Sequence, residues 1–305
     1  MIIPREQDNV TLAIGRKRVP VTNLNKIFFP AIGVTKGDLL QYYADVSEVL
    51  LPHIADRPMV MKRYPHGASG DFFFMKRTPE PHPEWLRTCR IEHDSGNIIN
   101  FPVIDDLAAL MWVINLGCID LNQWYARCDD VDRPDYVHFD LDPGESAFAM
   151  VRDVALLVRD GLHALGMRSY AKTTGSKGMH VYVPIVRGPT QKEVWGFAKE
   201  FATALARHTT ELTTVAYHKD KRPKDRVLLD YNQNRWGATL ASVYSVRPTP
   251  HASVSAPVTW QEVEAGIEVD DFRIDNMPAR IAKLGDLWKP LTAKRGRFDL
   301  ASLFH

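Results

Sequence analysis

Two carboxylates in the segment Val137–Gly144 have the type and spacing that chemistry at a metal ion would need. The segment reads VHFDLDPG, so Asp140 and Asp142 alternate with apolar residues. Because side chains of a β-strand alternate between faces, His138, Asp140 and Asp142 would share the face opposite the core. The two acids would lie roughly 7 Å apart along the strand and could converge on a divalent cation. A solvated strand face has the same alternation, so the pair alone leaves both interpretations open.

A third acid favours the metal site. Asp230 ends a second apolar run, which begins at Arg226. Carboxylates are hard oxygen ligands, which Mg²⁺ and Mn²⁺ prefer. Two such ions suit phosphoryl transfer, because they activate the attacking hydroxyl and stabilise the leaving pyrophosphate. We therefore interpret Asp140, Asp142 and Asp230 as a candidate catalytic and metal-binding set.

A glycine-rich turn, TTGSKGMH at residues 173–180, is the second candidate. Glycine permits positive φ and close approach of a ligand, so the turn could present N–H groups, Ser176 and Lys177 to a phosphate. It is not a P-loop, because GxxxxGK[ST] is absent. An ordinary hairpin turn fits the residues equally well, and His180 could then be a partly exposed structural residue.

Basic residues also lie beside aromatic ones. Lys62 precedes Tyr64, and Lys76 follows the run Phe72–Phe74. Three consecutive phenylalanines in a strand cannot all face the core, and an exposed ring beside a lysine suits stacking on a nucleic-acid base. The charged run HKDKRPKD at residues 218–225 is more typical of a solvated loop than of a binding patch.

Helix signals surround these segments. Capping-box spacing or a capping residue predicts four helix starts, and an apolar run predicts one buried helix. The predicted starts are at Thr35 for a helix through residue 51, at Ser146 for one to about Gly166, at Thr190 with Glu193 and at Thr259 with Glu262, and the buried helix lies within 105–117.

Strand-like segments alternate with the helices. The pattern predicts a strand at 135–142, a hairpin of 168–174 with 179–186, and a second pair of 226–231 with 239–247. Helices mixed with hairpin-like neighbours predict an α+β fold with a mixed or antiparallel sheet.

The composition is that of a globular protein. The chain has 305 residues, 38 Lys+Arg against 37 Asp+Glu, and 45% hydrophobic residues. These values argue against disorder, collagen-like repeats, a coiled-coil rod and a polybasic protein, but not against a local basic face. Three cysteines without CxxC spacing argue against a disulfide framework or zinc site and favour a reducing cytoplasm. No apolar run approaches the ~20 residues that span a bilayer, so we expect no membrane partner.

Taken together, the motifs resemble a known family. They are, in order, NLNKIFFPAIGVTKGDLLQYY, RPMVMKRYPHG, FFFMK, HFDLDPGE, TTGSKGMHVYVP, LLDYNQN, SVYSVRP and SAPVTWQEV. The sequence resembles the polymerase domain of bacterial ligase D, in the archaeo-eukaryotic primase superfamily. Within that superfamily it looks closest to the stand-alone actinobacterial primase-polymerases related to ligase C.

The resemblance implies a single primase-polymerase domain over residues 1–305. Residues 1–130 would form mainly an N-terminal α/β module, and residues 131–305 mainly a catalytic module with an RRM-like sheet that interlocks with it. The implied metal ligands are Asp140, Asp142 and Asp230, holding two Mn²⁺ or Mg²⁺ ions. The implied nucleotide contacts are Lys62, Asn122, Ser176, Lys177, His180, Gln233 and Arg247. Lys26 and Lys36 match lysines that hold a DNA 5′-phosphate, and Phe73 and Phe74 match aromatics that stack on the template or nucleotide.

The sequence departs from the family pattern at two positions. Many relatives have a histidine after the buried helix, in a pattern like E-x-H, whereas this chain has Asn122 in its place, within the segment Ile119–Trp124. Asparagine can form hydrogen bonds but carries no charge, which changes the expected nucleotide contact. Met75 stands where relatives often have glutamate. We also expect no ligase or nuclease domain after the segment Val263–Phe304.

The resemblance implies a template-dependent nucleotidyltransferase that fills short gaps in DNA during repair, using NTPs or dNTPs and releasing pyrophosphate. Its expected partners are gapped or broken DNA with a 5′-phosphate, a separate DNA ligase and an end-binding protein. The expected location is the bacterial cytoplasm, at the nucleoid when bound to DNA. The alternatives are a primase that starts chains de novo, a metal-dependent nuclease or other DxD transferase, and a non-catalytic nucleic-acid-binding module.

Overall fold

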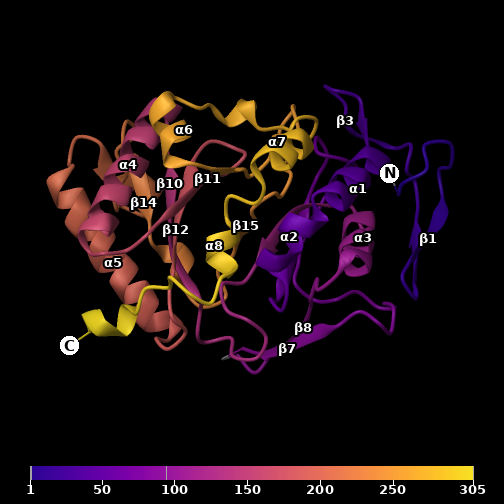
Figure 1. Cartoon of the computed structure of the whole chain (residues 1–305), viewed down its shortest axis with the longest axis horizontal. Coiled ribbons are helices and arrows are strands. Elements are labelled where there is room, and N and C mark those ends of the chain that lie inside the picture. The colour runs from indigo at the N-terminus through magenta and orange to yellow at the C-terminus, as the bar shows by residue number, and fades with distance from the viewer. Residues whose placement is uncertain (1, 94, 305) are drawn as a thin grey trace. The chain divides into compact units, whose positions relative to one another are not determined.

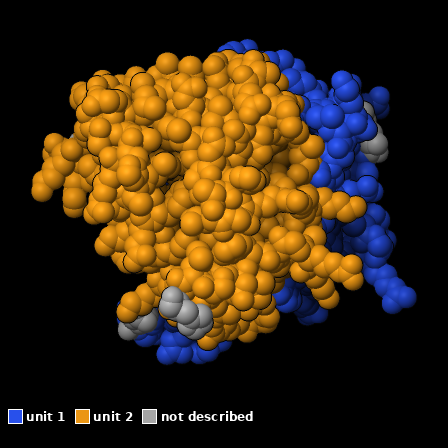
Figure 2. Space-filling model, turned by 60° about the vertical axis from the view of Figure 1, so that its left-hand side comes forward, with its two compact units in different colours: residues 1–124, 240–254, 272–286 blue, residues 125–239, 255–271, 287–305 orange. Residues whose placement is uncertain are grey.

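The chain divides into two compact units, which a computed structural model describes over residues 2–93 and 95–304 (Figures 1 and 2). Unit 1 comprises residues 1–124, 240–254 and 272–286, and unit 2 comprises residues 125–239, 255–271 and 287–305. The units alternate along the sequence, because the chain returns to unit 1 twice after entering unit 2. Helices and sheets occur in both units, which confirms the α+β class.

Unit 1 is built on a four-stranded sheet in the order β15-β9-β5-β6. Its strands are β5 (Met59–Arg63), β6 (Phe73–Met75), β9 (Cys118–Gln123) and β15 (Leu240–Ala241). The hairpins of this unit are β1 (Val10–Ile14) with β2 (Lys17–Val21), β3 (Ile27–Phe29) with β4 (Val34–Thr35), and β7 (Thr88–Glu92) with β8 (Ile98–Pro102). Its helices are α1 (Lys36–Asp45), α2 (Ser47–Ile54), α3 (Leu107–Asn115) and α7 (Met277–Leu284).

Unit 2 is built on a six-stranded sheet in the order β13-β14-β10-β12-β11-β16. Its strands are β10 (Tyr136–Asp142), β11 (Tyr170–Thr173), β12 (Met179–Pro184), β13 (Thr213–Thr214), β14 (Val227–Asp230) and β16 (Pro257–Val258). All neighbouring pairs are antiparallel except β13 with β14, so the sheet is mixed, as predicted. Its helices are α4 (Phe148–Ala164), α5 (Gln191–His208), α6 (Trp260–Ala265) and α8 (Lys289–Thr292). Short 3₁₀ helices lie at Lys219–Lys221, Asn232–Asn234, Val269–Asp271 and Leu300–Leu303.

The predicted core face of β10 is confirmed. Val137, Phe139 and Leu141 are fully buried beneath α4 and α5, which cover this face of the sheet (Figure 1). The Phe139 ring lies 4.9 Å from that of Phe201 on α5. On the other face His138 is also fully buried, stacked against Tyr182, so this end of the strand is not solvated.

Most predicted helix starts are confirmed. Thr35, Thr190 and Thr259 each cap a helix with a capping box, in which the hydroxyl accepts a backbone N–H and an acid three residues on bonds back. The apolar run forms the buried helix α3, capped by Asp106.

Three local predictions were wrong. The helix after Thr35 divides at Val46, where the Ser47 hydroxyl donates to the Ala44 carbonyl. Ser146 does not cap α4, because its N–H closes a turn onto the Pro143 carbonyl, 2.9 Å away, and the helix begins two residues later. Residues 226–231 and 239–247 do not pair: β14 has β10 and β13 on its two edges, and β15 joins β9 in unit 1.

The described residues also bear on disulfides and on membrane-spanning helices. The three cysteines form no disulfide within residues 2–93 and 95–304. In that same part of the chain, no helix combines the length and apolar character that crossing a membrane requires.

Candidate active site

Three strands of unit 2 bring ionisable side chains into one row. Asp140 on β10 is the cross-strand partner of Asp230 on β14 and of His180 on β12. Direct partners in an antiparallel pair have Cβ atoms about 4.5–5.5 Å apart, so the three side chains lie on one face as neighbours. The His180 Nε2 atom lies 3.2 Å from Asp140 Oδ1. The sheet register therefore brings together two of the expected metal ligands and one expected nucleotide contact.

Asp230 is buried beside a like charge. Burial raises the pKa of its carboxyl group above the ordinary value, and the charge of Asp140 raises it further. Two hydrogen bonds act in the opposite direction, from the Asn232 N–H at 2.8 Å and from Gln233 Nε2 at 3.1 Å. Gln233, an expected nucleotide contact, thus lies against this carboxylate.

Asp142 contacts a cation instead of another acid. It lies two residues along β10, half exposed, and its Oδ2 is 3.4 Å from Nη1 of Arg222. The same guanidinium donates to the carbonyls of Ala216 and Tyr217. Sequence reasoning did not single out Arg222, since it belongs to the charged run at 218–225 that we interpreted as a solvated loop. Within the described ranges, no group of three or more His, Cys, Asp or Glu side chains is arranged to hold a metal ion as it stands.

The glycine-rich turn is organised by Thr174. Its Oγ1 accepts the backbone N–H groups of residues 176, 177 and 178 at 3.0–3.2 Å. These N–H groups therefore point into the turn, whereas the side chains of Ser176 and Lys177 are exposed on it. Gly175 has φ +66°. A Cβ at Gly178 would overlap the Leu141 carbonyl oxygen at the end of β10. The glycines thus allow the turn to pack closely. Because the N–H groups of the turn already bond to Thr174, a ligand would be bound by the side chains of the turn.

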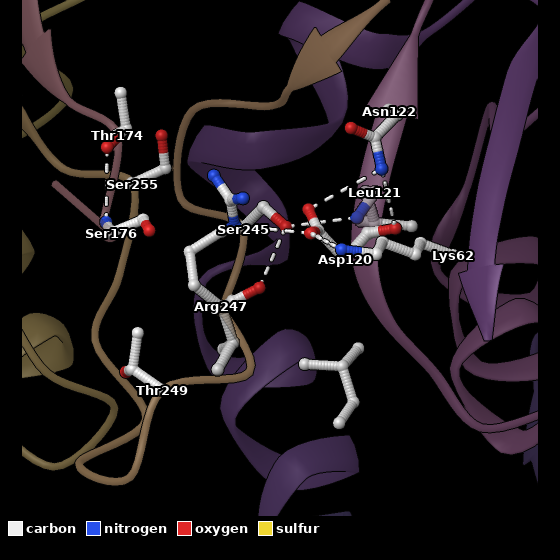
Figure 3. A network of polar contacts seen from close by, with 12 residues as sticks. Lys62, Asp120, Leu121, Asn122, Thr174, Ser176, Ser245, Arg247, Thr249 and Ser255 are labelled. Atoms are coloured by element: carbon white, nitrogen blue, oxygen red, sulfur yellow. Dashed lines mark hydrogen bonds and ion pairs between the residues drawn. The ribbon is translucent and has the colours of Figure 1, made fainter. Parts of the chain in front are cut away.

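Unit 1 carries a separate cationic cluster on its four-stranded sheet (Figure 3). Lys62 on β5 is the cross-strand partner of Asp120 on β9, and their charged atoms lie 3.9 Å apart. Nε of Arg247, in the chain after β15, lies 3.2 Å from the same Asp120 oxygen. Asn122 directs its Nδ2 atom to the carbonyl of Asp120 at 3.1 Å. Sequence reasoning identified the two cations and the amide but assigned no part to the acid that all three contact.

Aromatic side chains border this cluster. Phe72, Phe73 and Phe74 are 50%, 42% and 58% exposed at β6, the edge strand. Phe74 is the cross-strand partner of Lys62, and the Phe72 ring lies 4.1 Å from the Lys62 ammonium. Phe73 alternates to the other face, where Arg63 lies over its ring. Of the two expected stacking residues, only Phe74 is next to Lys62, and Phe72 joins it there.

The two lysines expected at a 5′-phosphate are neighbours in unit 1. The Lys36 N–H donates to the Lys26 carbonyl at 2.8 Å. The Lys26 ammonium is exposed and donates to the Pro65 carbonyl, whereas Lys36 is buried and donates to the Thr22 carbonyl at 2.6 Å. Burial, followed by the charge of Lys26, lowers the pKa of Lys36 to about 8. A buried cation beside another cation favours an anionic ligand.

The opposed carboxylates beside a glycine-rich turn in unit 2 suit a metal-dependent phosphoryl-transfer enzyme, and the family comparison identifies the class as a nucleotidyltransferase of the polymerase type. The family model of the LigD primase-polymerase domain matches residues 35–288 of the sequence, and the chain belongs to this family. Enzymes of this class are DNA-directed and metal-dependent.

Comparisons with individual proteins agree with the family. The chain is 34% identical over 280 residues to the multifunctional non-homologous end joining protein LigD of Mycolicibacterium smegmatis, which covers 91% of this chain and 36% of that protein. It is 29% identical over 272 residues to the bifunctional non-homologous end joining protein LigD of Bacillus subtilis, and this match covers 88% of this chain and 43% of that protein. The chain therefore spans less than half the length of these curated relatives.

A solved structure matches more completely. The polymerase domain from Mycobacterium tuberculosis ligase D, in complex with DNA, superposes with a TM-score of 0.86 at 32% identity. The match covers 92% of this chain and 99% of that chain. The α+β fold and the polymerase class thus agree with the sequence prediction.

Proposed function

We propose that this protein fills short gaps in broken DNA during repair by end joining. It would extend a primer 3′-hydroxyl with NTPs or dNTPs and release pyrophosphate, in the bacterial cytoplasm. The names of the LigD relatives and the DNA in the neighbouring polymerase-domain structure support this substrate. A separate DNA ligase and an end-binding protein would act on the same break.

The observation that carries the proposal is the placement of Asp140 opposite Asp230. Two neighbouring carboxylates, one with a raised pKa caused partly by the other, fit a divalent cation that would relieve their repulsion. Asp140 and Asp230 would hold it, and Asp142 would contribute after exchanging Arg222 for metal. Bound Mn²⁺ or Mg²⁺ would supply Lewis-acid activation of the hydroxyl and stabilise the charge of the leaving pyrophosphate.

The side chains around the acids would position the nucleotide. Ser176 and Lys177, exposed on the turn of unit 2, would bind the triphosphate. Within unit 1, Lys62 and Arg247 would bind nucleotide phosphates, because the two cations contact the same carboxylate oxygen there. His180 would hold the Asp140 carboxylate in place as well as approach the phosphates. These groups act by positioning and by offsetting charge that develops on the phosphates.

Other groups of unit 1 would select the DNA and the nucleotide. Lys26 and Lys36 would bind the 5′-phosphate on the far side of a gap, because they are adjacent cations. Phe74 would stack on a template base, and Phe73 would offer a second ring on the opposite face of β6. Asn122 would replace the charged contact of a family histidine with a neutral hydrogen bond.

The test is primer extension on a gapped duplex with Mn²⁺ and labelled nucleotide. Asp140→Ala should lower the rate on the order of 1,000-fold, because it removes a carboxylate at the reacting centre. The control Asp160→Ala removes an exposed acid of α4 and should retain the wild-type rate. Thermal unfolding of both variants checks the fold. Normal extension by a folded Asp140→Ala variant would contradict the proposed metal site.

A further inference from the structure

Asp120 is a buried acid that lies beneath two cations of unit 1. Its side chain is 2% exposed, whereas those of Lys62 and Arg247 are 17% and 18% exposed. Its Oδ2 atom is the one that both cations approach, at 3.9 and 3.2 Å. An anion that approaches from solvent therefore meets the cations before the acid, whose carboxylate lies between them (Figure 3).

The chain that carries Arg247 is fixed to the strand that carries Asp120. Buried hydrogen bonds join the two segments beside Asp120 and Arg247, one of them directly and two through Tyr43 of α1. They run from Tyr43 Oη to Ile119 O at 2.7 Å, from Val246 N to Tyr43 Oη at 3.0 Å, and from Leu121 N to Ser245 Oγ at 3.0 Å. The guanidinium and the carboxylate thus face each other from rigid backbone, which keeps the loss of conformational freedom on ligand binding small.

The acid also affects the charge of Lys62. Burial lowers the pKa of the Lys62 ammonium, the charge of Asp120 opposes that effect, and the charge of Arg247 lowers the pKa further. Without the carboxylate, two partly buried cations would repel each other with nothing between them. Asp120 therefore allows both cations to occupy one small region of the sheet.

We propose that Asp120 is the positioning residue of this cluster: it holds Lys62 and Arg247 side by side and charged, so that together they bind the phosphates of a nucleoside triphosphate. The inference deepens the proposed function, on which it rests. One acid shared by two cations leaves a net positive charge, which suits a polyphosphate. Asp120 itself touches no ligand and acts through its two partners.

Charge counting alone gives the opposite expectation. Replacing Asp120 with asparagine removes a negative charge, so simple Coulomb attraction would strengthen the binding of a polyphosphate. A positioning role requires weaker binding, because Lys62 and Arg247 lose their common partner and Lys62 loses its proton more readily. The direction of the change therefore separates the two interpretations.

The experiment measures binding and turnover of the full-length chain with Mn²⁺. Binding of a fluorescent ATP analogue is followed by anisotropy at pH 7.5 and 9, and primer extension gives KM and kcat. For Asp120→Asn we expect about tenfold weaker binding, because Lys62 and Arg247 are no longer held in position to form charge-assisted hydrogen bonds with the phosphates. KM should rise by a similar factor with kcat within about twofold, and the binding defect should grow as the pH rises, because Lys62 loses its proton more readily without the carboxylate.

Two variants control the interpretation. Asp120→Glu keeps the carboxylate, so it should bind more tightly than Asp120→Asn, although its extra methylene must fit a buried site. Glu92→Gln removes an exposed acid that pairs with Arg90 in unit 1, and it should bind like wild type. If Asp120→Asn does not fold, the double variant Lys62→Met/Asp120→Asn is used instead and is compared with Lys62→Met. The double variant loses one cation together with the anion, so it leaves fewer unpaired charges in the buried cluster. The double variant should bind more weakly, because Arg247 is no longer anchored.

Tighter or unchanged binding by folded Asp120→Asn, or equal affinities of the double variant and Lys62→Met, would overturn the inference. The proposed function fails separately, if the wild type binds the analogue but never extends a primer. In that case weaker binding by Asp120→Asn would still support the positioning role.

Discussion

The Lys36 ammonium should make recognition of a 5′-phosphate sensitive to pH. Its pKa of about 8 arises mainly from burial and next from the charge of Lys26. A phosphate would bind the protonated form, so affinity is full below this pKa and falls as the pH rises through it. The protonated fraction of a group with pKa 8 falls from roughly nine tenths at pH 7 to roughly one tenth at pH 9, which predicts about tenfold weaker binding.

The assay is fluorescence anisotropy on a gapped duplex that carries either a 5′-phosphate or a 5′-hydroxyl at the gap. The measured quantity is the ratio of the two dissociation constants, from pH 7 to pH 9. The range begins at pH 7 because the phosphate itself gains a proton near pH 6. Lys36→Arg keeps a charge throughout this range and should give a constant ratio. A wild-type ratio that is the same at pH 7 and pH 9 would refute the assignment of Lys36 to the phosphate.

Two further predictions concern the glycine-rich turn. Gly178→Ala should lower the free energy of unfolding by about 2 kcal/mol or more, because its Cβ would overlap the end of β10, whereas Gly188→Ala has open space and should change it little. Thermal unfolding measures both, and equal melting temperatures would contradict the reasoning. Thr174→Val should cost about 2 kcal/mol by leaving backbone N–H groups without their acceptor, while Ser176→Ala, whose side chain is exposed, should cost under about 0.5 kcal/mol. A chemical-denaturation series compares the two, and a similar loss in both would contradict the assigned part of Thr174.

The sequence predicted well what depends on short-range pattern. The strand with Asp140 was found because apolar alternation has a period of two. Two capped helix starts, at Thr190 and Thr259, were found because a threonine and an acid three residues on bond locally. The pairing of 226–231 with 239–247 was wrong, because strand pairing depends on which sheet edges remain open. That is a long-range property, which neither segment encodes alone.

The site was predicted unevenly for the same reason. The residue types of the acids and of the turn were informative, but the direction of each side chain depends on partners far away in the sequence. Asp142 turns to Arg222, eighty positions later, and the turn N–H groups bond to Thr174 instead of facing solvent. Asp120 was assigned no role because its part in the site depends on Lys62 and Arg247, which lie far from it in the sequence.

The alternation of the two units along the chain has a consequence for dissecting the protein. A cut after residue 124 would leave unit 1 without the segments 240–254 and 272–286, and so without strand β15 and helix α7. Neither unit corresponds to one continuous gene fragment. An N-terminal half expressed alone would lack part of unit 1, and a C-terminal half would contain segments of unit 1 besides unit 2. Fragment exchange with a relative should therefore follow three stretches per unit, and a single crossover point would mix the two units.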